Sequence, residues 1–414
     1  VSAWVALWRR HGRLPFARLL APAIRLARDG FHVSPVVAAQ WAAAGAELAG
    51  EPGFAAAYLP GGRAPRAGEI FALPAQAAAL EAIAASEGAA FYEGGLAEAM
   101  AADARAHGAA LSLDDLAAHR ADWVDPIGAD FDDVTLHEIP PNGQGIAALI
   151  ALGLLRHAGL PEAGPDDAAT LHVQIEAMKL AFADVYAEVA DQAAMRVAPE
   201  AMLDDGYLET RARLIDPERA GDPGPGRPPA GGTVYLAAAD DRGMMVSLVQ
   251  SNYMGFGSGV VVPGTGISLQ NRGCGFVLTQ GHPNRVGPGK RPFQTILPGF
   301  LSDRDGPAMA FGVMGGPMQP QGHLQIALRM RRFGQSPQAA IDAPRWRVLG
   351  GRRLALEPGF PPETVAGLAA RGHEIVASSA EHDFAFGGAQ AIHRIPGGYI
   401  AGSDGRKDGA AVGF

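Results

Sequence analysis

The feature that most constrains this chain is a glycine- and proline-rich segment, residues 221–232, which stops abruptly at Thr233. Proline lacks a backbone donor and glycine leaves φ free, so this segment can form neither a helix nor a central strand. Two apolar runs follow, residues 233–239 and 245–251, with a polar, glycine-containing turn between them. The pattern predicts a flexible tether, then a strand, a turn and a second strand.

Thr233 has an ordinary and a functional interpretation. Threonine is common in strands, so the residue could simply begin one. If the bond between Gly232 and Thr233 is cut, however, Thr233 carries both a hydroxyl nucleophile and a free α-amine. Such an amine has a pKa of about 7.7–8.0 and can accept the hydroxyl proton near neutral pH. One residue would then supply both nucleophile and base.

Several motifs in this half of the chain resemble, in order and spacing, the small subunit of the γ-glutamyltransferase family. They are the run 233–240, Ser251-Asn252-Tyr253, Gly255-Phe256-Gly257-Ser258-Gly259, Gly264-Thr265-Gly266-Ile267 and Pro288-Gly289-Lys290-Arg291-Pro292. The family consists of threonine-type N-terminal nucleophile hydrolases, and the match is closest to its amidase-like branch, which includes oxamate amidohydrolase-type proteins. The resemblance implies an α/β (α+β) fold, the four-layer αββα sandwich of the N-terminal nucleophile hydrolases.

The resemblance covers nearly the whole chain and also implies its organisation. Residues 1–220 match a helix-rich large-subunit part, 221–232 a tether ending at the processing site, and 233–414 the small-subunit part that carries the nucleophile. Both parts are expected to form one αββα domain and to stay associated after cleavage, with a dimer of heterodimers as one arrangement open to them. The first residues resemble a helix inside the large subunit, so we expect an N-terminal segment of the relatives to be missing here.

Acyl transfer needs a nucleophile, a base and donors for the oxyanion. Thr233 would supply the first two. Gly315 and Gly316 follow a strand-like run, 308–313, and match the glycine pair that forms the oxyanion hole in the family; a plain strand-end turn is the alternative. Ser251 matches a hydroxyl residue that hydrogen-bonds the nucleophile, although serine at a strand end is also unremarkable.

Departures from the family pattern indicate the substrate. Where γ-glutamyltransferases carry a Gln and an Asp that hold the substrate's α-amine, this chain has Arg272 and Gly275. Charge complementarity then favours a ligand without an α-ammonium, and Arg272 is suited to gripping a carboxylate, unless it is a structural surface arginine. Gln294 and Thr295 replace a serine pair that contacts substrate, and Tyr253 is assigned to substrate binding with them.

Composition excludes other classes of function. The net charge of −9 argues against a nucleic-acid partner, and no apolar run approaches the length of a membrane helix. No signal peptide is visible, which slightly favours the cytoplasm, but the chain begins without Met and the compartment stays open. The single cysteine, Cys274, cannot form an intrachain disulfide; we expect a small buried residue rather than a nucleophile.

No cofactor and no metal are expected. The twelve histidines include no pair at metal-ligand spacing. His172, Glu176 and Asp184 belong to a helix predicted over 168–191, where they lie off the apolar stripe together with Lys179. We assign them to a solvated face. A single strand is predicted over 131–138. The resemblance of Pro140 to Gly145 to the family's Pro-Pro-rich loop implies a loop near the active-site rim, with a plain strand-to-helix turn as the alternative.

Three hypotheses follow. The favoured one is a self-processing N-terminal threonine amidohydrolase that acts, through an acyl-enzyme, on a small amide bearing a carboxylate. The second is a γ-glutamyl hydrolase or transferase acting on glutathione-like substrates, against which Arg272 and Gly275 argue. The third is an unprocessed, inactive relative with a binding role, because Gly232 is atypical before the nucleophile.

Overall fold

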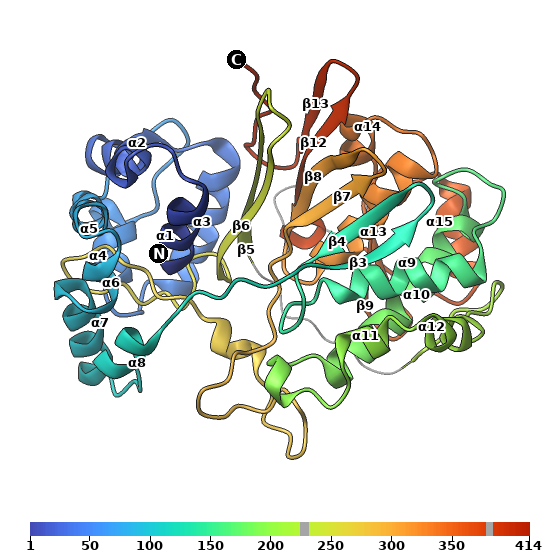
Figure 1. The fold of residues 1–414 in the computed structure, drawn as a ribbon, viewed down its shortest axis with the longest axis horizontal. Coiled ribbons are helices and arrows are strands. Elements are labelled where there is room, and N and C mark those ends of the chain that lie inside the picture. Colours follow the sequence, from blue (N-terminus) through green and yellow to red (C-terminus); the bar gives the residue numbers. More distant parts are fainter. Residues whose placement is uncertain (224–231, 378–383) are drawn as a thin grey trace. The chain divides into compact units, whose positions relative to one another are not determined.

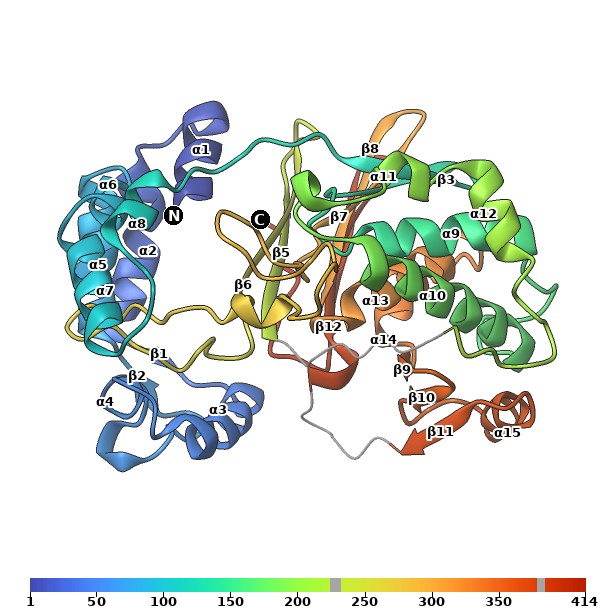
Figure 2. The same ribbon diagram turned by 90° about the horizontal axis from the view of Figure 1, so that it is seen from below.

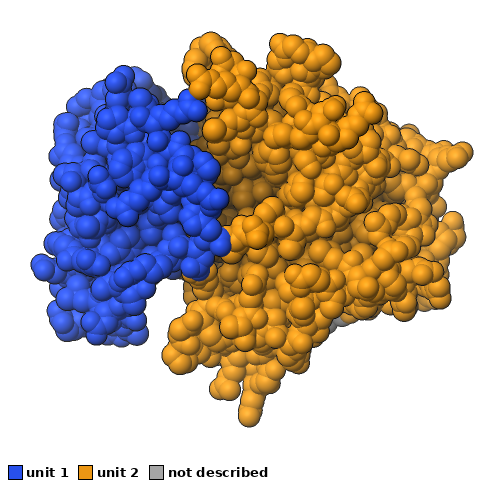
Figure 3. Space-filling model, in the orientation of Figure 1, with its two compact units in different colours: residues 1–123, 256–270 blue, residues 124–255, 271–414 orange. Residues whose placement is uncertain are grey.

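The computed structural model describes residues 1–223, 232–377 and 384–414. Most of the predicted tether, residues 224–231, lies outside these described ranges and is drawn in grey in Figure 1. The chain divides into two compact units, residues 1–123 with 256–270 and residues 124–255 with 271–414 (Figure 3). The sequence predicted a different division, into two fragments produced by cleavage at the tether. That division stays a prediction.

The first unit is mainly helical. Its helices are α1 (Ser2–His11), α2 (Phe16–Asp29), α3 (Pro35–Leu48), α4 (Phe54–Tyr58), η1 (Pro60–Gly62), α5 (Pro74–Ala85), α6 (Ala89–Tyr92), α7 (Gly95–Ala106) and α8 (Leu113–Ala118). Two short strands, β1 (Phe31–His32) and β2 (Ile70–Phe71), pair antiparallel. Ser112 caps α8 by accepting the N–H of Asp115 at 3.2 Å, while the Asp115 carboxylate accepts the N–H of Ser112 at 2.9 Å. This reciprocal capping explains why the helix begins there.

The second unit is built on a six-stranded antiparallel sheet with the order β13-β12-β8-β7-β4-β3. Its strands are β3 (Ile127–Phe131), β4 (Val134–Glu138), β7 (Gly299–Asp303), β8 (Gly306–Met314), β12 (Gly388–Ile395) and β13 (Gly398–Ser403). The predicted strand over 131–138 is confirmed for β4, but residues 132–133 form a turn and Phe131 ends β3, so the range contains part of a hairpin rather than one strand. Asp132 at its turn has φ of 50°, a left-handed conformation in which Asp is enriched.

Helices cover one face of this sheet (Figures 1 and 2). The packed helices are α9 (Ile146–Ala158), α10 (Ala168–Glu188) and α13 (Met318–Arg331). The remaining elements of this unit are η2 (Gln192–Ala194), α11 (Pro199–Met202), α12 (Asp205–Ala212), η3 (Arg272–Gly275), α14 (Pro337–Asp342), α15 (Pro362–Ala370), η4 (Phe384–Phe386) and a small sheet of β9 (Trp346–Gly350), β10 (Arg353–Leu356) and β11 (Glu374–Ala377). One core joins the helices to the sheet, and α9 is buried along nearly its whole length.

The hairpin β5 (Gly232–Ala239) and β6 (Met245–Tyr253) packs on the opposite face, as Figure 2 shows. The predicted strand, turn and strand after the tether are therefore confirmed. Gly312 of β8 permits the close approach, because a Cβ built there would lie 2.3 Å from the ring of Tyr235. The second unit thus stacks a helical layer, a sheet and a hairpin, with Thr233 near the start of β5.

The polar residues of α10 are not where the sequence pattern put them. His172, Glu176 and Lys179 are buried, so the prediction of a solvated face is wrong for them. The reason is that α10 packs against α9 on one side and against α15 and β9 on another, which leaves little of its surface in water.

Within the described residues, no helix combines the length and hydrophobicity that crossing a bilayer requires.

Candidate active site

Thr233 lies at an irregularity in the hairpin. The register between β5 and β6 shifts between Gly232 and Val234, and the Thr233 side chain is 9% exposed. Its Oγ1 lies 3.2 Å from the Oγ of Ser251 on the partner strand. Ser251 Oγ also accepts the N–H of Tyr253 at 2.8 Å. The two hydroxyls that the sequence paired therefore meet.

Gly315 and Gly316 form the turn between β8 and α13, with φ of 128° and 59°. Glycine is suited to both conformations because it has no Cβ. The Gly315 carbonyl accepts the N–H of Met318 at 3.2 Å, and in a trans peptide the N–H of Gly316 points the opposite way, out of the helix turn. Among the described residues, neither glycine N–H donates to a protein acceptor. Both amides remain available at the positive end of a 14-residue helix.

Arg272 is held in η3 with its side chain largely inside the protein, 8% exposed. Its Nη1 donates to Thr295 Oγ1 at 3.3 Å, and its guanidinium carbon lies 5.4 Å from the ring centroid of Tyr253. Burial lowers the pKa of Arg272 to about 10, against the opposing influence of Tyr253, so the group keeps its charge at neutral pH. The prediction of an exposed structural arginine does not describe it.

The proline-rich loop expected at the rim lies directly against these residues. Gln144, fully buried, donates from Nε2 to the carbonyl oxygens of Thr295 at 3.0 Å and Gly316 at 2.9 Å. Its backbone N–H donates to the Gln294 carbonyl at 2.9 Å. Gln294 Oε1 is itself buried and has no hydrogen-bond partner among the described residues. Gln144 thus joins the candidate oxyanion turn to the segment that carries Gln294 and Thr295.

Gln319 was not selected from the sequence, and neither was Gln144. Gln319 Nε2 lies 3.5 Å from Thr233 Oγ1, and its backbone N–H donates to the Gly316 carbonyl at 3.0 Å. The available sequence signals were weak: Gln144 lies in the Pro-Pro loop, and Gln319 lies in the first turn of the helix after the glycine pair.

When Gln144 and Gln319 are included, the contacts around Thr233 form a closed ring. They run in order through Thr233, Ser251, Tyr253, Arg272, Thr295, Gln144, Gly316 and Gln319, back to Thr233. All of these residues belong to the second unit. The structure therefore brings together Thr233, the Gly315-Gly316 turn and Arg272, three candidates that the sequence suggested separately.

A buried hydrogen bond between His323 and Glu138 supports the strand that leads to the glycine turn. His323 Nε2 accepts the N–H of Val313 at 3.3 Å, and His323 Nδ1 lies 2.5 Å from Glu138 Oε1. An imidazole that accepts at Nε2 must carry its proton at Nδ1, so it donates to the carboxylate. His323 and Glu138 together hold the backbone of Val313 near the end of β8.

One group among the described residues has the composition of a metal site: His172, Glu176 and His373, all buried. Their other polar atoms already bind one another or a neighbour, whereas His373 Nδ1 has no hydrogen-bond partner among the described residues. His172 Nδ1 and His373 Nε2 are 2.8 Å apart, and Glu176 accepts from Lys179 Nζ at 2.7 Å. A cation would have to separate the imidazoles and displace the ammonium group.

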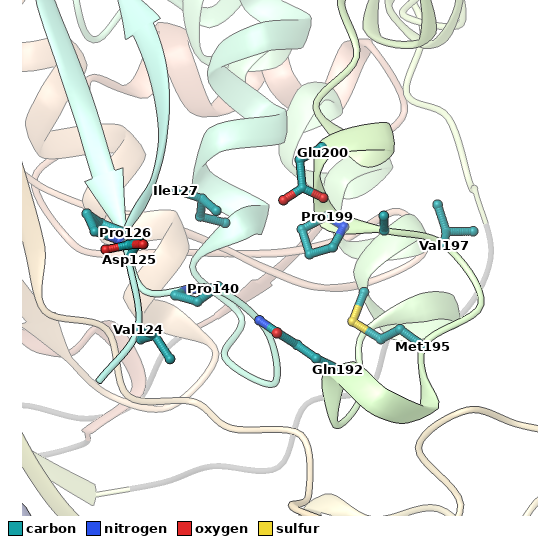
Figure 4. Close-up of a pocket in the computed structure, with 11 residues that line it drawn as sticks. Val124, Asp125, Pro126, Ile127, Pro140, Gln192, Met195, Val197, Pro199 and Glu200 are labelled. Atoms are coloured by element: carbon teal, nitrogen blue, oxygen red, sulfur yellow. The ribbon is translucent and has the colours of Figure 1, made fainter. Parts of the chain in front are cut away.

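The cavity drawn in Figure 4 has a volume of about 580 Å³ and is not lined by Thr233 or its contacts. Asp125, Glu200, Gln192 and Pro140 are among its lining residues. It borders the proline-rich loop, because Gln192 donates to the Pro141 carbonyl at 2.8 Å.

Cys274 does not line this cavity and is exposed, so the expectation of a buried cysteine is wrong. The short η3 turn leaves its side chain in solvent.

The fold and the comparisons with known proteins define an amide-hydrolysing enzyme of the N-terminal nucleophile class. The family model described as Gamma-glutamyltranspeptidase matches residues 1–414, and the chain belongs to this family. It is 39% identical over 425 residues to the oxamate amidohydrolase proenzyme of Klebsiella pneumoniae, covering 100% of this chain and 80% of the relative. It is 35% identical over 420 residues to the glutathione hydrolase-like YwrD proenzyme of Bacillus subtilis, covering 100% of this chain and 79% of that relative.

A solved structure confirms the fold. The crystal structure of cephalosporin acylase from Bacillus halodurans matches with a TM-score of 0.93 and 46% identity, over 99% of this chain and 76% of that one. The predicted fold class, the αββα sandwich of the N-terminal nucleophile hydrolases, and the predicted enzyme class, a hydrolase acting on amide bonds, are therefore both confirmed. The similarity to an oxamate amidohydrolase proenzyme and to a cephalosporin acylase favours the amidohydrolase hypothesis over the other two.

Proposed function

We propose that Thr233 is the nucleophile of a self-processing amidohydrolase whose substrates are small amides bearing a carboxylate. The observation that supports this most strongly is the closed set of contacts through Thr233, Gly316 and Arg272. It places a hydroxyl, an amide turn and a buried cation within one network.

Processing would begin with Thr233 Oγ1 attacking the carbonyl carbon of Gly232. The C–O bond forms as the C–N bond to Thr233 breaks, which moves the acyl group from nitrogen to oxygen. Water then hydrolyses the ester. The products are a carboxylate at Gly232 and a free α-amine at Thr233, and that amine is the base that the mature enzyme needs.

Turnover would use the same oxygen. The Thr233 amine takes the proton from Oγ1 as Oγ1 attacks the substrate's amide carbon. The N–H groups of Gly315 and Gly316 stabilise the resulting oxyanion. The amine returns its proton to the leaving nitrogen when the C–N bond breaks, which leaves an ester on Thr233. A water molecule, deprotonated by the same amine, releases the acid product.

Arg272 would select the substrate. A buried guanidinium can bind a carboxylate bidentately, and such an arrangement repels an ammonium group. The alternative γ-glutamyl site would need an acidic side chain at position 275. There is no room for it, because a Cβ on Gly275 would lie 2.5 Å from the Phe293 carbonyl oxygen. We therefore favour substrates resembling those named for oxamate amidohydrolase or cephalosporin acylase over glutathione-like ones.

The two fragments would remain one body after cleavage. A single core combines Ile150 and Met178, from before the tether, with Phe311 and Leu324, from after it. Separating the fragments would expose this core to water, at about 25 cal/mol for each Å² of apolar surface. A dimer of such heterodimers would use surfaces that this core leaves free.

A substrate panel tests the proposal. Purified protein should release ammonia or amine from oxamate and from carboxylate-bearing acyl amides, with much weaker activity on a γ-glutamyl anilide. Thr233→Ala should remain one polypeptide on a denaturing gel and be inactive on every substrate. Normal affinity for the γ-glutamyl anilide would favour the second hypothesis. A single uncut and inactive wild-type chain would favour the third.

A further inference from the structure

We infer that Gln319 is a positioning residue for Thr233, and that it ties the orientation of the nucleophile to that of the oxyanion turn. This inference rests on the proposed function, because it assigns a role within the same site. Gln319 is fully buried in the first turn of α13. The amide of Gln319 has no reactive chemistry of its own, so the proposed role comes from its contacts with Thr233 and Gly316.

The orientation of the Gln319 amide follows from its neighbours. The N–H of Leu297 donates to Gln319 Oε1 at 3.0 Å. A backbone N–H can only donate, so the atom that faces it must be the amide oxygen. The NH₂ group therefore faces Thr233, and Thr233 Oγ1 is its acceptor at 3.5 Å.

This donor constrains the hydroxyl of Thr233. Before cleavage frees the α-amine, with Gln319 donating to Oγ1, the hydroxyl proton is directed toward Ser251 Oγ, 3.2 Å away. One lone pair is then oriented by Gln319 and another is left for attack on a carbonyl. As Oγ1 gains negative charge, the amide donor stabilises that charge. A contact of 3.5 Å is long, and catalytic hydrogen bonds of this kind commonly shorten as the reaction proceeds.

The backbone of the same residue binds the oxyanion turn. Gln319 N–H donates to the Gly316 carbonyl at 3.0 Å, and the Gly316 carbonyl also accepts from Gln144 Nε2 at 2.9 Å. A movement of the first turn of α13 would therefore shift the glycine amides and the threonine hydroxyl together. Gln319 keeps the attacking atom and the oxyanion donors in one geometry.

Gln321 provides a matched control. It is the same residue type on the same helix, is also fully buried, and uses its amide in two backbone hydrogen bonds, to the Pro317 carbonyl at 3.0 Å and from the Val348 N–H at 2.7 Å. Neither bond reaches Thr233. Removing either glutamine amide leaves a buried backbone N–H without its acceptor, so the two variants should lose comparable stability.

The test compares Gln319→Leu with Gln321→Leu, using kinetics at saturating substrate on correctly folded protein. Gln319→Leu should lower kcat about 10- to 100-fold with KM little changed, which is the effect of losing one hydrogen bond to a developing charge. It should also slow the appearance of the two fragments. Gln321→Leu should change kcat by less than about threefold, since it touches no reacting group. Equal losses of kcat in the two variants would overturn the inference.

Gln319→Glu tests the donor directly and keeps the shape of the side chain. A carboxylate still accepts from Leu297 but cannot donate to Thr233, whereas a protonated carboxyl can. The ratio of variant to wild-type kcat should therefore rise as the pH is lowered. A ratio that stays flat with pH overturns the inference even if Gln319→Leu does not fold. Activity that survives in Thr233→Ala would instead contradict the proposed function, so the two failures can be told apart.

Discussion

The hydroxyl oxygens of Thr233 and Ser251 lie 3.2 Å apart on paired strands of one hairpin. Ser251→Ala removes this contact and should lower kcat by up to about tenfold, because a neutral hydrogen bond contributes about 0.5–1.5 kcal/mol. KM should hardly change. Ser247→Ala, on the same strand and bonded to the Tyr235 hydroxyl at 2.9 Å, is the control. If both variants keep full kcat, Ser251 has no role in orienting the nucleophile.

Arg272 should determine affinity for anionic substrates. Losing one partner of a buried, hydrogen-bonded charge pair costs about 2–5 kcal/mol, so Arg272→Ala should raise KM for carboxylate-bearing amides about 30-fold or more. A neutral amide of the same size should show no such change. Arg291→Ala, which removes an exposed cation, should leave both values as they are. An unchanged KM for anionic amides in Arg272→Ala would remove this residue from the binding site.

Gly316 should matter for kcat more than for binding. Its φ of 59° suits glycine, and a side chain there would force the turn to rearrange and reorient an oxyanion donor. Gly316→Ala should lower kcat about 100- to 1,000-fold, the usual effect of losing one such donor. Gly306→Ala introduces similar backbone strain at φ of 104°, at the first residue of β8, and should cost stability only. Equal kcat in the two variants would contradict the assignment.

Stability should depend on pH through Asp404. Burial alone would raise the pKa of this carboxyl, but Arg345 and Arg406 outweigh burial and lower it. Arg345 Nη2 donates to Asp404 Oδ2 at 2.6 Å, and both side chains are buried. A carboxyl whose folded pKa is depressed contributes stability above its unfolded pKa of about 3.9, and that stability is lost as the pH falls through the folded pKa.

Asp404→Asn should therefore reduce the free energy of unfolding at pH 7 by about 3–5 kcal/mol, because it leaves a buried arginine uncompensated. Urea unfolding should show this difference narrowing below about pH 4. Asp133→Asn, which breaks an exposed pair with Arg331, should change stability by about 1 kcal/mol or less. If the difference in free energy of unfolding between wild type and Asp404→Asn is the same at pH 7 and at pH 3, the loss of the carboxylate charge does not cause that difference.

Local patterns were enough to predict the strands around Thr233. The hairpin after the tether follows from turn residues and apolar runs, which act within a few positions. The same signals failed at Asp132. The turn between β3 and β4 places only Asp132 in a left-handed conformation, and no glycine or proline in the sequence indicated a turn at this position.

Long-range packing was not predictable in the same way. His172, Glu176 and Lys179 have the spacing of a polar helix face, yet they are buried because α10 is enclosed by other elements. Gln144 and Gln319 join the candidate site through contacts that span 172 and 86 positions of sequence. Glutamine has no chemistry that marks it as functional, so only the assembled fold reveals that Gln144 contacts Gly316 and that Gln319 contacts Thr233.

The account depends on Thr233 becoming a chain end. The most direct measurement is intact-mass and N-terminal analysis of catalytically active protein, separated under denaturing conditions. We predict two fragments, with the smaller one beginning at Thr233 and carrying a free α-amine, and an uncut chain for Thr233→Ala. Active protein in which Thr233 is still joined to Gly232 by a peptide bond would contradict the account.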